Sequence, residues 1–112
     1  MAIATPPADV SNAELIRWAF DVLNTRDITP LRPFWTDATI ERFPQGTCYG
    51  EAAIARYFED LFAALPDLHI RIASIAEHGE DVFVHWHLTG RHTGAPLEGI
   101  EATGRAIALD GP

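Results

Sequence analysis

The 112-residue chain contains no lysine, and its eight arginines face sixteen acidic residues, which gives a net charge of −8. An acidic protein with scattered arginines repels phosphate groups, so this composition argues against nucleic acid or an anionic membrane as a partner. Cys48 is the only cysteine, which excludes an internal disulfide and suits a reducing compartment. The start of the chain lacks a basic region and an apolar run, and no stretch approaches the length of a membrane span. We therefore expect a cytoplasmic protein.

Several chemical signatures are also missing. The sequence has no phosphate-binding loop, no glycine fingerprint for dinucleotides, no C-x-x-C pair and no serine-hydrolase elbow. Nothing around Cys48 indicates catalysis, so we interpret it as an inert thiol. Hydrophobic residues make up 47% of the chain and charged residues 21%, which is typical of one globular domain.

The first half of the chain is predicted to be helical. Residues 1–10 are expected to form a flexible tail, and 11–112 a single domain. Ser11, followed three residues later by a glutamate, indicates the start of a helix over 12–24. A short second helix is expected to open at Thr29 and Pro30, and the strongest apolar stripe predicts a third helix over 51–65.

The strands are predicted mostly in the second half. An early strand over 38–43 turns into a short partner, and a meander of three strands follows at 68–76, 82–93 and 101–109. Helices that precede an antiparallel meander predict an α+β fold. We expect the three helices to cover one face of one curved sheet.

The stretch "HWHLTGRHTG", residues 85–94, carries three of the five histidines. Strand side chains alternate between faces, so Trp86 and Leu88 share one face while His85 and His87 share the other. If Ala76 pairs with Val82, the face of Trp86 is nearly all apolar and meets the helices.

The opposite, outer face is expected to carry the two neighbouring histidines together with Phe83 and Ile75. An H-x-H pair can bind a metal, but Arg71 would stand opposite His87, which disfavours one; no metal is expected. We interpret this face as a homodimer contact, formed by Arg71, Phe83, His85 and His87.

Two further residues are candidates for catalysis. His92 shares the helix-facing side by parity, and Gly90 would leave space beside it, as at the mouth of a pocket. Alternatively, His92 is a loop histidine that backbone groups satisfy. Arg105 would lie at the pocket's edge and hold a carboxylate or enolate oxygen, or else form a structural ion pair. The expected pocket lining is Trp35, Ile40, Arg42, Tyr57 and Trp86.

Three runs carry a resemblance to a known family: "LFAALPDLHIRI" (61–72), "GEDVFVHWHLTGRHTG" (79–94) and "GIEATGRAIALDG" (99–111). They resemble the SnoaL-like polyketide cyclases of the nuclear transport factor 2-like superfamily, and residues 20–58 are similar to that family's helical half. The resemblance implies a conical α+β barrel around an apolar pocket and dimers through the outer sheet face. It also implies a ring closure by intramolecular aldol condensation, without metal or organic cofactor. His92 falls on the family's G-x-H-x-G histidine, and Arg105 just after its T-G pair.

Two departures from the family qualify these expectations. Ala102 replaces a common proline, and the chain stops at Pro112, before the family's last strand with its acid/base aspartate; Asp110 is too early to replace it. We expect that the sheet closes differently, that another chain supplies the strand, or that this is a truncated version. The function expected is an aldol cyclase or related isomerase or lyase acting on a small apolar molecule. The alternative is a non-catalytic binding or dimerisation module. Limonene epoxide hydrolase chemistry needs an inward Asp–Arg–Asp set, and only arginines are expected inside.

Overall fold

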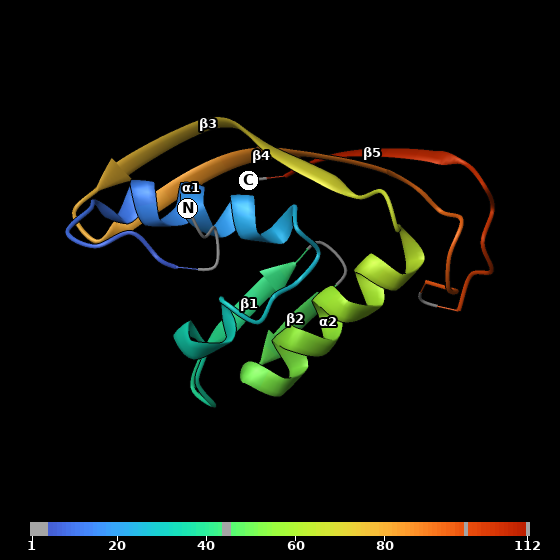
Figure 1. The fold of residues 1–112 in the computed structure, drawn as a ribbon, viewed down its shortest axis with the longest axis horizontal. Helices are drawn as coiled ribbons and strands as arrows, with labels where there is room; N and C mark the ends of the chain where they lie inside the picture. Colours follow the sequence, from blue (N-terminus) through green and yellow to red (C-terminus); the bar gives the residue numbers. More distant parts are fainter. Residues whose placement is uncertain (1–4, 44–45, 98, 112) are drawn as a thin grey trace.

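The computed structural model describes residues 5–43, 46–97 and 99–111. Two α-helices, α1 (Asn12–Leu23) and α2 (Glu51–Ala64), lie on the same side of a three-stranded sheet (Figure 1). Within these ranges, no helix is long and apolar enough to cross a membrane. The expected tail over residues 1–10 lies partly outside the described residues and stays a prediction.

Helix α1 begins where its capping residue predicts. The Ser11 side chain accepts a hydrogen bond from the Glu14 N–H at 3.2 Å, which satisfies one of the free donors of the first turn. The buried residues of α1 are Trp18, Val22 and Leu23.

The expected second helix is reduced to a 3₁₀ turn, η1 (Arg32–Phe34). Pro33 lacks an N–H donor, and Trp35 already has extended backbone angles, so the turn cannot propagate. Leu31 is buried just before it, while Phe34 is 48% exposed and tilts against Trp18 at 5.6 Å between ring centroids. The described part of the chain therefore has two α-helices rather than the expected three.

In the described residues, five strands form two separate antiparallel sheets rather than the one curved sheet that was expected. The hairpin pairs β1 (Ile40–Phe43) with β2 (Gly46–Tyr49), and the larger sheet has the order β3 (His69–His78), β4 (Asp81–Arg91), β5 (Ala106–Gly111). Strand β5 begins five residues later than expected, because residues up to Arg105 form a loop. The predicted α+β class is confirmed.

The register of β3 with β4 agrees with the prediction up to Ile72 and differs beyond it. Ile70 pairs with Leu88 and Ile72 with Trp86, as expected. The register then shifts at Ala73, and Ile75 rather than Ser74 pairs with Val84. The extra residue forms a bulge that reverses the facing of everything beyond it. Ile75 therefore joins the helix-facing side, and its expected place on the outer face is wrong.

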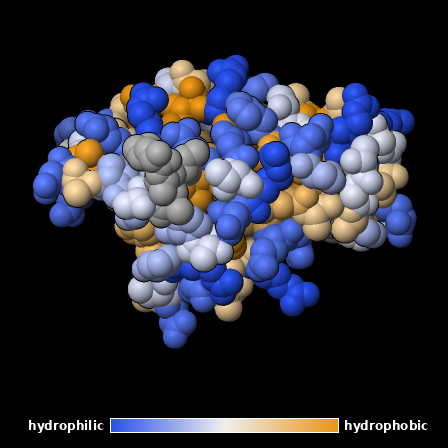
Figure 2. Space-filling model, in the orientation of Figure 1, coloured by the Kyte–Doolittle hydropathy of each residue, from blue (hydrophilic) through white to orange (hydrophobic). Residues whose placement is uncertain are grey.

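The core lies between α1, α2 and the larger sheet. Its most deeply buried large side chains are Val22, Ile54, Leu65 and Leu68. Asn24, just beyond α1, ties the helix to β3: its Nδ2 donates to the Ile70 carbonyl at 2.7 Å, and its Oδ1 accepts from the Ile70 N–H at 2.8 Å. Figure 2 shows apolar residues reaching the surface in several patches between hydrophilic ones. The large exposed ones are Phe34, Ile40, Tyr49, Phe83, Ile100 and Leu109.

Candidate functional site

His92 lies inside the protein, at the end of β4. It is only 3% exposed, and its Nε2 lies 2.9 Å from the Ala95 carbonyl oxygen. That oxygen can only accept, so in this contact Nε2 carries the proton. The main chain of His92 is also paired, because its N–H donates to Arg105 O at 3.1 Å and its carbonyl accepts from the Gly104 N–H at 2.8 Å. The inward facing predicted for His92 is found, with the ring bound to the backbone.

The space expected beside His92 is filled. A Cβ at Gly90 would lie 3.3 Å from the Leu65 Cβ, so Leu65 occupies the gap that was predicted as a pocket mouth. The following loop is fastened to the end of α2 by two backbone hydrogen bonds, Gly94 N–H to Ala64 O at 3.1 Å and Ala95 N–H to Ala63 O at 2.9 Å. His92 thus lies where the end of β4 is hydrogen-bonded to the end of α2, which we call the joint between β4 and α2. Its catalytic role stays a prediction.

Arg105 is exposed, in the loop before β5. A shallow hollow of about 300 Å³ lies nearby, lined by Asp67, Thr89, Gly90, Arg91, Ala106, Ile107 and Ala108. Two of its polar side chains make hydrogen bonds: Asp67 Oδ1 accepts from the Arg91 N–H at 2.8 Å, and the Arg91 guanidinium donates to the Gly104 carbonyl at 2.7 Å. None of the residues predicted to line the pocket borders this hollow.

The facing of β1 is the reverse of the expected one. Ile40 is 47% exposed and Arg42 is exposed, whereas Glu41 and Phe43 are half-buried. The Phe43 ring decides this, because it stacks on Tyr57 of α2 at 3.8 Å between centroids and 10° between planes. Ile40 and Arg42 therefore lie on the other face of β1 from Phe43, and their place in the pocket lining stays a prediction.

An aromatic cluster joins the hairpin to α2, and we define it as Trp35, Phe43, Tyr57, Phe58 and Phe62. Trp35 stacks on Phe58 at 5.9 Å and 9°, and Phe58 stacks on Phe62 at 6.2 Å. The members are all half-buried, so each keeps part of its surface in contact with solvent. Two of the expected lining residues, Trp35 and Tyr57, belong to this cluster.

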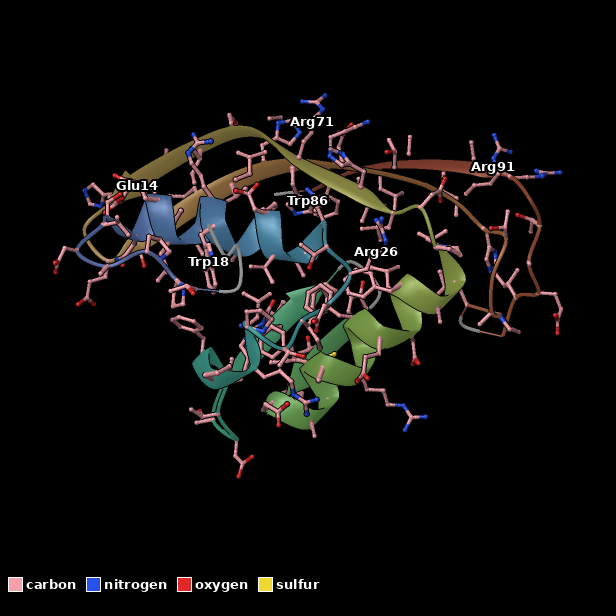
Figure 3. The ribbon with its side chains drawn as sticks, viewed as in Figure 1. Glu14, Trp18, Arg26, Arg71, Trp86 and Arg91 are labelled. Carbon is pink, nitrogen blue, oxygen red and sulfur yellow. The ribbon has the colours of Figure 1, made fainter. Side chains whose placement is uncertain are left out.

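Trp86 lies on the helix-facing side of β4 (Figure 3). A Cβ at Gly111, its partner on β5, would lie 2.0 Å from the indole ring, so the ring covers the strand end at a place where only glycine fits. The neighbouring Leu109, on the same side of β5, remains 42% exposed. The helix-facing side of the sheet thus keeps an apolar area beyond Trp86 that the described helices leave partly uncovered.

Glu41 is not among the residues that the sequence predicts for the site, although the structure places it on the half-buried face of β1. Burial raises the pKa of its carboxyl group above the ordinary value of 4.5. No ion pair or hydrogen bond joins its carboxylate to another residue in the described ranges, and its oxygens keep contact with solvent, because no fully buried side-chain oxygen there lacks a partner. A carboxyl group of this kind accepts and releases protons closer to neutral pH than a solvated one does. Phe43, two residues further along β1, is the sequence signal that could have indicated which face of the strand is buried.

The outer face of the larger sheet carries a row of charged residues from three strands. Arg71 pairs with His87, which pairs with Asp110, and His87 Nδ1 lies 2.5 Å from Asp110 Oδ1. The hydrogen bond with His87 lowers the pKa of Asp110, and the charges of His87, His85 and Arg71 add to this effect. Phe83, on the same face, is 62% exposed. The residues predicted for a dimer contact thus share one face, pointing away from the helices.

No three histidine, cysteine, aspartate or glutamate side chains gather closely enough to hold a metal ion, as far as the described part of the chain extends. We therefore assign no metal ligands.

Comparison with solved structures places this architecture among the nuclear transport factor 2-like folds. A candidate SnoaL-like polyketide cyclase from Jannaschia sp. CCS1 superposes with a TM-score of 0.73 at 18% identity, over 93% of this chain and 78% of that one. A protein of unknown function from Exiguobacterium sp. 255-15, described as nuclear transport factor 2-like, gives 0.63 at 19% identity over 83% and 77%. AclR, a candidate hydroxylase from Streptomyces galilaeus, gives 0.69 at 18% identity over 82% of this chain, which spans 60% of AclR.

A family model shows which family within this fold the chain belongs to. The model of the SnoaL-like polyketide cyclases matches residues 13–111, nearly the whole chain. The protein therefore belongs to the SnoaL-like polyketide cyclase family, as the resemblance indicated. A search of curated protein sequences found no match.

Proposed function

We propose that this protein binds a small, flat, mainly apolar carbonyl compound of the polyketide type and moves protons on it without a metal or organic cofactor. The reaction is an intramolecular aldol cyclisation or a related isomerisation or lyase step. The observation that carries the proposal is the aromatic cluster, whose half-buried rings offer stacking surfaces to a planar ligand beside one unpaired carboxyl group. Family membership supports the reaction class.

The chemistry needs two proton movements. A base takes a proton from a carbon next to a carbonyl group, and the resulting enolate carbon forms a bond to a second carbonyl carbon. The second carbonyl oxygen then receives a proton and becomes a hydroxyl group. Stacking rings hold the two carbons together, so that positioning contributes much of the rate.

The proposal does not depend on His92 or Arg105. His92 is buried with Nε2 bound to a carbonyl, and the Arg105 side chain is exposed. Their roles as catalytic residues remain predictions, which substitution can test once a substrate is known.

Ligand binding is measured by quenching of tryptophan fluorescence with a planar probe, 2-acetylnaphthalene, and with a branched aliphatic ketone of similar size. The protein has three tryptophans, one of them in the cluster. We expect saturable quenching by the planar ketone only, weakened at least tenfold by Tyr57→Leu. Tyr49→Leu is the matched control, because Tyr49 is 68% exposed and lies on the opposite face of the hairpin. Equal quenching by both ketones, or equal loss in both variants, would contradict the proposed site.

The second candidate function is a non-catalytic binding or dimerisation module of the same fold. The exposed Phe83 beside Arg71, His85 and His87 favours a homodimer through the outer face. Light scattering at micromolar concentration tests this, with Phe83→Glu expected to give a monomer and Glu80→Gln, in the neighbouring turn, to leave the dimer intact. A wild-type monomer would refute the dimer proposal. We also propose that the protein is cytoplasmic.

A further inference from the structure

We propose that Glu41 is the acid/base residue of this site: β1 presents its half-buried carboxyl group on the face that packs against α2, alongside the aromatic cluster. This inference rests on the proposed function, for which it names the group that moves the proton. The sequence alone predicts His92 for that task.

The backbone fixes where Glu41 points. Successive residues of β1 alternate between exposed and half-buried, and the half-buried members are Glu41 and Phe43. The Phe43 ring stacks on Tyr57 and meets Phe58 edge-on at 5.6 Å, so this face of the strand is the one against α2. Glu41 is therefore on the side of the aromatic cluster.

The surroundings of Glu41 contain few other titratable groups. Across the hairpin, the half-buried Cys48 is its direct partner and shares its face. From α2, the Tyr57 phenol is on the facing side, while the charged side chains are engaged elsewhere or exposed. Glu51 is paired with Arg32 at 2.6 Å, and Arg56, Asp60 and Glu59 are exposed. No described cation neutralises the Glu41 carboxylate.

This environment suits proton transfer. A partly desolvated carboxylate is a stronger base than a solvated one, because burial disfavours its charge and raises its affinity for a proton. The protonated form can then return the proton to a carbonyl oxygen, so one residue can serve both steps.

Two other carboxylates are less suitable. Asp110 lies on the outer face of the sheet, where His87 holds it and lowers its pKa, which makes it a weaker base. Glu77 is exposed at the far end of β3 and accepts a hydrogen bond from the Ala13 N–H at 3.1 Å. Both are structural partners of neighbouring elements.

The test uses a planar probe that reports proton removal directly, nitrobenzisoxazole. The Glu41 carboxylate takes the proton of the isoxazole C–H, the electron pair of that bond forms the nitrile, the N–O bond breaks, and the oxygen leaves as a coloured phenolate. No oxidant, reductant or cofactor is needed. Binding is followed separately, by tryptophan quenching with the same probe.

We expect wild-type turnover above the buffer rate, with a pH profile that rises through a midpoint above the ordinary glutamate pKa of 4.5. Glu41→Gln should lower the rate by about 10²-fold, within the range for general acid–base groups, and leave quenching unchanged. Glu41→Asp should keep part of the rate. Glu59→Gln, which removes an exposed carboxylate from α2, is the matched control and should behave as wild type.

The outcomes separate the two proposals. If Glu41→Gln turns the probe over at the wild-type rate, or if wild type binds the probe without turnover, the assignment of Glu41 is overturned while the ligand site stands. If wild type does not bind the probe, the proposed function fails as well. If Glu41→Gln does not fold, the pH midpoint of wild type and the rate of Glu41→Asp decide. A wild-type midpoint at or below 4.5, or a Glu41→Asp rate equal to that of wild type, would indicate a base other than Glu41 and overturn the assignment.

Discussion

His92 offers a sharp test of the joint between β4 and α2. The structure buries its ring to 3% exposure and bonds Nε2 to the Ala95 carbonyl at 2.9 Å. His92→Ala removes that hydrogen bond, leaves the carbonyl without its partner and opens a cavity. A lost hydrogen bond contributes about 1 kcal/mol and a large-to-small change in a core about 2–5 kcal/mol. Because part of the ring volume can be refilled, we expect a loss of about 2–4 kcal/mol in the free energy of unfolding.

Urea unfolding followed by circular dichroism measures this loss. With a slope of about 1–3 kcal/mol per molar urea for a domain of this size, the midpoint should fall by about 1–3 M. His78→Ala is the matched control, because His78 is exposed at the end of β3, and its substitution should change the free energy by less than about 0.5 kcal/mol. A stability loss in His92→Ala no larger than in this control would refute the structural role of His92.

Two further predictions concern the ties between elements. Asn24→Ala should lower the free energy of unfolding by about 2–4 kcal/mol in the same urea assay, because both the N–H and the carbonyl of Ile70 lose their partner. Asn12→Ala, at an exposed position, is the control. An equal loss of stability in both variants would contradict the role of Asn24. Asp110→Asn should lower stability only where Asp110 is charged. The folded-state pKa of Asp110 is lowered, so its contribution is fully present above the ordinary value of 3.8 and is lost as the pH falls through the lowered pKa. The difference in thermal midpoint between Asp110→Asn and wild type should therefore vanish at strongly acidic pH, and a difference that persists there would count against the His87–Asp110 pair.

The predictions from sequence succeeded where one strong local signal or a long period determined the outcome. Ser11 marks the start of α1 within one residue, and the apolar stripe gives α2 within one residue of its observed end. The pairing of Ile70 with Leu88 followed from the turn and the period of two. The family resemblance, carried by three runs of sequence, is confirmed by the family model.

The failures came from single residues whose effect depends on tertiary contacts. The bulge at Ala73 has no sequence signal, yet it reverses the facing of Ile75. A strand as short as β1 offers two alternating faces of mixed character, and only the stacking of Phe43 on Tyr57 decides between them. That choice puts Ile40 and Arg42 on the exposed face of β1 and Glu41 on the half-buried one. Gly90 was interpreted as empty space, whereas glycine there permits close packing of Leu65.

The most direct test of the account is the pKa of Glu41 in the folded protein, measured by ¹³C nuclear magnetic resonance of the side-chain carboxyl with Glu41→Gln to assign the signal. The account predicts a midpoint above the ordinary value of 4.5, which falls to that value when the protein is unfolded in urea. A folded-state midpoint at or below 4.5 would show a solvated or ion-paired carboxylate and would contradict the central claim that this fold holds Glu41 as a partly desolvated base on the side of its aromatic cluster.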